Sequence, residues 1–134
     1  SVSAFLLNRS SDLLVDGEVS VDANNKLTAS FNVGGNNKEW GGVNVTIPDY
    51  NESKTSYVSS SNAFNYFKEG MGGWTQIECR NGELTIEVTK NGDVYSFKVN
   101  GPGTLIDRSL GMDWDTAMPV TVGAEFSIKN ISVE

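Results

Sequence analysis

Two short runs place a tryptophan at strand-like spacing from hydrogen-bonding side chains. In the run that starts at Trp40, period-two alternation puts Trp40 and Asn44 on one face. In the run that starts at Trp74, the same alternation adds an amide, a carboxylate and a guanidinium, those of Gln76, Glu78 and Arg80. A sugar ring presents apolar C–H groups that stack on aromatic rings, and a rim of hydroxyls that such polar groups bind. The two runs therefore predict a carbohydrate-binding surface.

A third tryptophan, Trp114, lies in a polar loop between Asp113 and Asp115. We expect Trp114 to wall one end of a sugar groove, where either aspartate bonds hydroxyls. Packing is the alternative interpretation for the tryptophans, because a tryptophan at the start of a strand can cover the end of a β-structure. Likewise, Glu78 and Arg80 belong either to the site or to a surface ion pair.

The chain contains no histidine, so the commonest general base and metal ligand is missing. Ser-His-Asp and Cys-His catalysis are therefore excluded, as is an ordinary zinc site. Glycoside hydrolysis needs one carboxyl held neutral and a second held ionised, and nothing around Asp113 and Asp115 indicates either environment. We predict that the protein is not an enzyme; the alternative is a hydrolase that uses Asp113 or Asp115 with Glu78. We interpret Cys79 as an inert buried thiol.

No cofactor is predicted from the sequence. Instead of catalysis, Asp113 and Asp115 could bind a structural calcium ion. The same applies to a second acidic group, which consists of Asp12, Asp16, Glu18 and Asp22. Neither group has the spacing of an EF-hand loop. Spacing therefore gives only a weak indication of calcium.

Composition limits the partners and the class of protein. The formal net charge is −7, from 10 basic and 17 acidic residues, and scattered lysines and arginines do not form the basic patch that nucleic acid requires. No apolar run approaches the ~18 residues of a membrane span. The 134 residues fit a single domain, 1–134. Since the chain starts at Ser1 without a signal peptide, we expect it to be excised from a larger protein.

Short alternating runs broken by glycine and asparagine predict an all-β fold. In the run from Lys26 to Val33 the apolar residues share one face, and the run from Trp40 to Ile47 buries its valines and isoleucine. The stretch from Trp74 to Asn100 predicts a three-strand meander, with hairpin turns at Asn81-Gly82 and Asn91-Gly92. About nine or ten strands are too many for one open sheet of this size, so two antiparallel sheets packed as a β-sandwich are predicted.

Two segments leave the pattern undecided. The stretch Asn62–Glu69 fits either a helix turn or a strand, because its aromatic residues do not choose between the two periods. In the last predicted strand, Ala124–Val133, the apolar residues change parity partway, which a β-bulge near Asn130 would reconcile.

The run from Gly73 through Gly101, which reads Gly-Trp-Thr-Gln-Ile-Glu-Cys-Arg-Asn-Gly and then alternates, resembles the concanavalin A-like glucanase/lectin superfamily. The closing run from Ala124 to Val133 is similar to the final strand of its modules. This resemblance implies a jelly roll of two curved antiparallel sheets, with glycan on the concave face or along one edge. The catalytic branch's Glu-x-Asp-x-x-Glu and the galectin branch's His and Asn-Pro-Arg are absent, so the resemblance implies the non-catalytic, binding type of member.

The sequence thus predicts a non-catalytic carbohydrate-binding module that binds a neutral polysaccharide or oligosaccharide, a β-linked glucan or hemicellulose. We expect a monomeric module of a secreted or cell-surface protein, appended to a bacterial glycoside hydrolase or surface protein, with no nucleic-acid or membrane partner. The alternative is a structural or adhesive β-sandwich whose aromatic residues all serve packing.

Overall fold

The computed structural model describes residues 3–8, 14–32, 40–60, 63–70, 73–78, 83–108, 111–113 and 115–131. Within its strands, the side chains of residues 3–8, 14, 40, 41, 60, 69, 70, 73 and 74 lie outside the described part. The predicted all-β fold is confirmed. The strands are β1 (Ser3–Asn8), β2 (Leu14–Val21), β3 (Leu27–Asn32), β4 (Trp40–Ile47), β5 (Ser56–Ser60), β6 (Phe64–Gly70), β7 (Gly73–Glu78), β8 (Glu83–Asn91), β9 (Val94–Asp107) and β10 (Met118–Asn130). No helix in the described ranges is long and apolar enough to cross a membrane.

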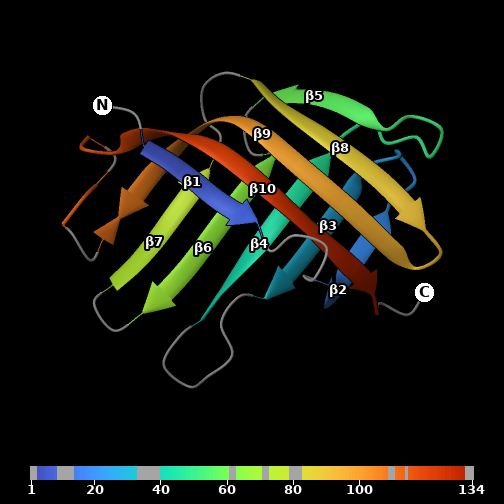
Figure 1. Cartoon of the computed structure of the whole chain (residues 1–134), viewed down its shortest axis with the longest axis horizontal. Helices are drawn as coiled ribbons and strands as arrows, with labels where there is room; N and C mark the ends of the chain where they lie inside the picture. The colour runs from blue at the N-terminus through green and yellow to red at the C-terminus, as the bar shows by residue number, and fades with distance from the viewer. Residues whose placement is uncertain are drawn as a thin grey trace.

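All ten strands belong to one sheet, in the order β1-β10-β2-β3-β4-β6-β7-β9-β8-β5, with a further pairing between β9 and β10. Figure 1 shows that the sheet folds over itself: β1, β10, β9, β8 and β5 cross in front of β7, β6, β4, β3 and β2. The predicted division into two separate sheets is not confirmed. Two pairings also depart from the antiparallel expectation, since β1 and β2 both run parallel to β10.

The sheet is continuous because two long strands each serve both layers. The first half of β9 pairs with β8, and its last residues, 104–107, pair with β7. Between these halves Gly101 has a φ of +145°, and a Cβ there would lie 2.8 Å from the Glu83 carbonyl oxygen. Only glycine fits this bend. At the other corner, residues 127–130 of β10 pair with residues 14–17 of β2.

The hydrophobic core lies between the two layers. It consists of the inward-facing residues, which are every second residue along most strands. In β4, Val43, Val45 and Ile47 are almost completely buried, as the alternation predicted. The Phe126 ring contacts residues of both layers, with ring centroids 5.4 Å from Phe97 and 5.1 Å from Phe31. These contacts fix which face of each strand remains for solvent or a ligand.

The two predicted hairpins have different outcomes. Strands β8 and β9 form the hairpin predicted at Asn91-Gly92, with Gly92 at a φ of +65° in a two-residue loop. The predicted pairing of β7 with β8 is wrong. The edges of β7 are occupied by β6 and by the end of β9, and those of β8 by β9 and β5. Asn81-Gly82 lies outside the described residues.

The two undecided segments are strands. The segment 62–69 contributes β6. In place of the predicted bulge, β10 ends at Asn130, and the Ile131 side chain is 56% exposed. The Asn130 amide accepts a hydrogen bond from the Val19 N–H and donates one to the Val19 carbonyl, both 3.0 Å long. The Ile131 backbone N–H also donates to the Gly17 carbonyl oxygen at 2.9 Å. Both the Asn130 side chain and the Ile131 backbone therefore hold the end of β10 against β2.

Candidate functional site

Two cross-strand rows of side chains cover β3, β4, β6 and β7 on the side away from the core. The first row consists of Asn32, Gly42, Phe67 and Gln76. The second row consists of Ser30, Asn44, Asn65 and Glu78. We call these eight residues the amide face, because four of them carry a side-chain amide. Since directly opposed residues lie about 5 Å apart, the face presents closely spaced hydrogen-bonding groups around one aromatic ring.

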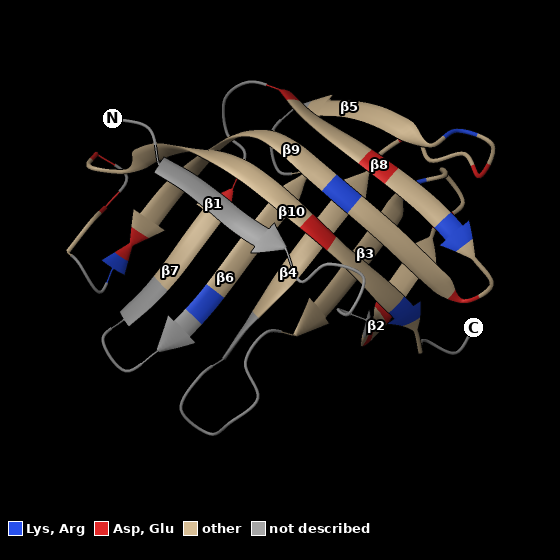
Figure 2. Ribbon diagram, in the orientation of Figure 1, with Lys and Arg blue, Asp and Glu red and all other residues tan. Residues whose placement is uncertain are grey.

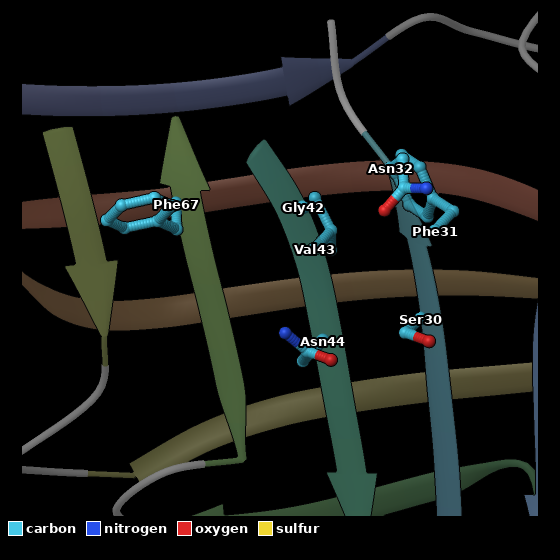
Figure 3. A pocket seen from close by; sticks show the side chains of 7 residues that line it. All are labelled: Ser30, Phe31, Asn32, Gly42, Val43, Asn44 and Phe67. Carbon is cyan, nitrogen blue, oxygen red and sulfur yellow. The ribbon is translucent and has the colours of Figure 1, made fainter. Parts of the chain in front are cut away.

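A hollow of about 330 Å³ opens in the amide face. It is lined by Ser30, Phe31, Asn32, Gly42, Val43, Asn44 and Phe67 (Figure 3). Because Gly42 has no side chain, the backbone of β4 forms the floor between the flanking polar groups. Figure 3 shows Phe67 on one side of β4 and Ser30 with Asn32 on the other. The hollow therefore combines an aromatic wall with amide and hydroxyl groups.

The second row contains polar groups that are partly withdrawn from solvent. Glu78 is 8% exposed, and the Gln76 Nε2 donates a hydrogen bond of 3.2 Å to the Glu78 Oε2. Asn65 stands between Asn44 and Glu78 in the register, and its buried Oδ1 accepts no hydrogen bond from any residue that the structure describes. An unsatisfied buried acceptor costs roughly 1–3 kcal/mol. The row therefore retains hydrogen-bonding capacity that the fold itself does not use.

The structure brings three of the predicted site residues together. Asn44 is exposed and lines the hollow, while Gln76 and Glu78 lie on the same face, as their alternation predicted. The backbones of Trp40 and Trp74 are both paired with Glu69 of β6, two residues along each strand from the first row. The Trp40 and Trp74 side chains lie outside the described part. Arg80, Trp114 and Cys79 lie outside the described residues altogether.

The predicted loop aspartates do not line the hollow. The Asp113 Oδ1 accepts hydrogen bonds from the Asp115 and Thr116 backbone N–H groups, at 3.0 and 3.1 Å, and from the Thr116 hydroxyl at 3.1 Å. The bonds from Thr116, more than that from Asp115, lower the pKa of the Asp113 carboxyl. Asp113 is thus engaged in shaping its own loop, and Asp115 is exposed within that loop.

The second acidic group likewise contributes to a turn. The Asp22 Oδ1 accepts hydrogen bonds from the backbone N–H groups of Asn24, at 2.8 Å, and Lys26, at 2.9 Å. Those bonds, that from Lys26 most strongly, lower the pKa of the Asp22 carboxyl. Asp16 and Glu18 are exposed, and Asp12 lies outside the described residues. Across the described ranges, no group of three or more His, Cys, Asp or Glu residues is placed to hold a metal ion.

Sequence reasoning did not select five residues of the amide face: Ser30, Asn32, Gly42, Asn65 and Phe67. Ser30 and Asn32 were assigned to the polar side of their strand, but alternation within one strand does not identify its neighbours. Phe67 follows two inward-facing aromatics, Phe64 and Tyr66, so its outward position depends on β6 being a strand. Asn65 shares that dependence. The sequence did contain one indication: if residues 64–67 form a strand, Asn65 and Phe67 have the opposite parity to Phe64 and Tyr66 and therefore face outwards.

Comparisons with protein-family models, with curated proteins and with solved structures found no match for this chain.

Proposed function

We propose that the domain binds a neutral glycan non-catalytically on the amide face. The observation that carries this proposal is the hollow around Gly42, where a half-buried Phe67 ring and the amides of Asn32 and Asn44 surround an open floor. An aromatic ring accommodates the apolar face of a sugar, and the amides both donate to and accept from its hydroxyls.

The charge of the face supports a neutral ligand. Seven of its eight residues are uncharged, and Glu78 is the exception. The described residues of this face hold no cation that would attract an acidic polysaccharide, and the formal net charge of −7 opposes one at long range. A β-linked glucan or hemicellulose fits this chemistry.

Binding without hydrolysis is supported by the spacing of the carboxylates. Along the second row, Glu18 of β2 lies four strands from Glu78 of β7, which is about 19 Å at the usual interstrand spacing. Glycosidases hold their two carboxyl groups within about 10 Å of each other. These two carboxylates of the described face therefore do not form a hydrolytic pair.

The proposal extends to the family and setting that the sequence resemblance implies. Of the jelly roll that the resemblance implies, the structure has two crossing β-layers (Figure 1), but these layers belong to one sheet and include two parallel pairings. We assign the domain the role of a monomeric module in a secreted or cell-surface protein that acts on or adheres to polysaccharide.

The test is titration calorimetry, with affinity electrophoresis, on a panel of β-glucans, xylan, mannan and an acidic polysaccharide. We expect a neutral member to bind with a dissociation constant of roughly micromolar to millimolar. Phe67→Ala should weaken binding about tenfold, the value of an aromatic contact, and Phe67→Leu should retain the apolar wall but lose part of the affinity. The proposal is wrong if no neutral glycan binds, or if folded Phe67→Ala binds as well as the parent chain.

A further inference from the structure

Two further hollows meet at one buried tyrosine, at the end of β3 and β4 away from the amide-face hollow. One, of about 470 Å³, is lined by Val21, Asn25, Tyr50, Asn51 and Glu52. The other, of about 340 Å³, is lined by Tyr50, Glu52, Thr55, Val88, Thr89 and Lys90. Tyr50 and Glu52 are common to both, so a single ligand placed over them contacts both sets of residues.

Hydrogen bonds hold the loops around these hollows. The Tyr57 hydroxyl lies 3.0 Å from the Asn51 N–H that donates to it, and 2.8 Å from the carbonyl oxygens of Asn51 and Lys54. The Tyr50 N–H donates to the Asn25 carbonyl at 2.9 Å, which joins the two loops. A site built from such fixed loops loses little conformational entropy on binding.

The Tyr50 hydroxyl is available to a ligand. The Tyr50 side chain is 8% exposed and lines both hollows. Burial, followed by the neighbouring Tyr95 and Glu52, raises the pKa of this hydroxyl, so it remains a protonated donor at neutral pH. Because the ring is buried in the core, Tyr50 offers its hydroxyl rather than a stacking surface.

The charges beside Tyr50 cancel each other. The Lys90 Nζ lies 2.7 Å from the Glu52 Oε1, and its ammonium also lies 5.6 Å from the centre of the Tyr95 ring. A paired carboxylate and ammonium still offer lone pairs and N–H groups to hydroxyls, but they present no net charge to an ion. The chemistry therefore favours a neutral polyhydroxylated ligand over an anion.

We propose that these joined hollows form a second glycan subsite, which holds a sugar by the edge of its ring through Tyr50, Glu52 and Lys90. This inference takes its ligand class from the proposed function, but not its location. Asn25 lies in the turn before β3, whereas Ser30 and Asn32 line the amide-face hollow in the second half of that strand. The five steps of β3 from Leu27 to Asn32 span about 16 Å, so the two sites lie at opposite ends of the strand.

The experiment is an NMR titration of the whole chain with a β-linked disaccharide and a hexasaccharide from the best-binding polysaccharide. The backbone amides of Gly42 and Asn44 report on the amide face, and those of Asn25, Asn51 and Glu52 report on the second subsite. We expect both groups of signals to shift. Tyr50→Phe should weaken the second response about fivefold, the effect of one hydrogen bond, and leave the first unchanged.

Tyr66→Phe is the matched control. It removes a phenolic oxygen from a half-buried tyrosine of β6 that lines none of the three hollows, and it should leave both responses unchanged. Shifts confined to Gly42 and Asn44, or a second response that Tyr50→Phe does not weaken, overturn the second subsite alone. Shifts confined to the second group overturn the amide-face proposal instead, and no shift with any glycan overturns both.

Discussion

The two outer faces of the folded sheet have similar strands but different chemistry. On the amide face, neutral side chains surround Phe67 and a glycine floor. On the opposite side, the outer residues of β8, β9 and β10 form a charged face around a hollow of about 370 Å³, with outward side chains Glu87, Thr89, Ser96, Lys98, Glu125 and Ser127. Figure 2 shows its acidic and basic positions on neighbouring strands.

Polar groups of the charged face stand opposite partners on neighbouring strands. The register sets Lys98 directly between Glu87 and Glu125, which are favourable cross-strand pairs. The Ser96 and Ser127 hydroxyl oxygens lie 2.8 Å apart and share a hydrogen bond. On the amide face, by contrast, the buried Asn65 Oδ1 has no donor among the described residues. The two hollows therefore have similar volumes but differ in the hydrogen bonds that they offer to a ligand. Volume alone does not identify a binding site.

The largest expected effect comes from filling the floor of the amide-face hollow. In Gly42→Ala the new Cβ would lie 3.3 Å from the Phe31 carbonyl oxygen, the closest contact it would make. This contact is tighter than an ordinary Cβ contact, so the Phe31 backbone must shift by a few tenths of an ångström. Reduced freedom of the unfolded chain offsets this strain, and the melting temperature should change little. Glycan affinity should fall about tenfold, as one extra carbon in a fitted pocket does.

Calorimetric titration and thermal unfolding of the same sample check this prediction. Gly17→Ala is the contrasting variant, because its Cβ would clash with the Ser30 carbonyl oxygen. This variant should destabilise the fold by roughly 1–3 kcal/mol. Unchanged glycan binding by Gly42→Ala would argue against the hollow as the site.

The next prediction compares the same substitution, asparagine to alanine, on the two faces. Asn44 and Asn100 are both exposed asparagines within strands, Asn44 on the amide face and Asn100 on the outer side of β9. Asn44→Ala should reduce glycan affinity about fivefold, the value of one hydrogen bond, and Asn100→Ala should not change it. Affinity electrophoresis of the two variants side by side measures the difference. Equal losses from both would remove the distinction between the faces.

A smaller effect concerns stability on the charged side. Ser127→Ala leaves the Ser96 hydroxyl without its partner, at a cost of about 0.5–1.5 kcal/mol and with no change in glycan binding. The double variant Ser96→Ala, Ser127→Ala should cost less than the sum of the single changes, because both partners are then removed. Denaturant unfolding of the four proteins gives the coupling energy, and strict additivity would contradict the assignment of this bond.

The sequence predicted which side of a strand a residue occupies more reliably than which strands are neighbours. Alternation placed Asn44 opposite to the buried Val43 and Val45, and it placed Gln76 and Glu78 on one side, because a pleated strand has a fixed period of two. For the pairing of strands, the sequence predicted that β7 pairs with β8, because the two are consecutive and a hairpin turn was predicted between them. The structure gives β7 to β6 and β9, a choice set by core packing between distant segments.

The same limit explains the difference between the predicted and observed sites. The hollow needs Asn32, Gly42 and Phe67 from three strands in one row, and no single-strand pattern indicates that row. Tyr50 comes from a loop, where its role depends on the neighbouring residues of β2, β8 and the turn before β3 rather than on periodicity. Sequence reasoning therefore identified the chemistry of the amide face but only part of its membership.

The smallest expected effect separates loop structure from ligand binding at Asp113. Because hydrogen bonds from Thr116 lower the pKa of Asp113 below its usual value of 3.8, the ionised carboxylate stabilises the folded loop. That contribution is fully present above the usual pKa and is lost as the pH falls through the lowered one. A carboxyl-carbon NMR titration should give a pKa below 3.8, and Thr116→Val should move it back towards that value.

Asp113→Asn should leave glycan affinity at pH 7 unchanged, since Asp113 does not line the hollow. If Asp113→Asn instead weakens glycan binding in a folded chain, the site extends from the amide face onto this loop, as the sequence first predicted.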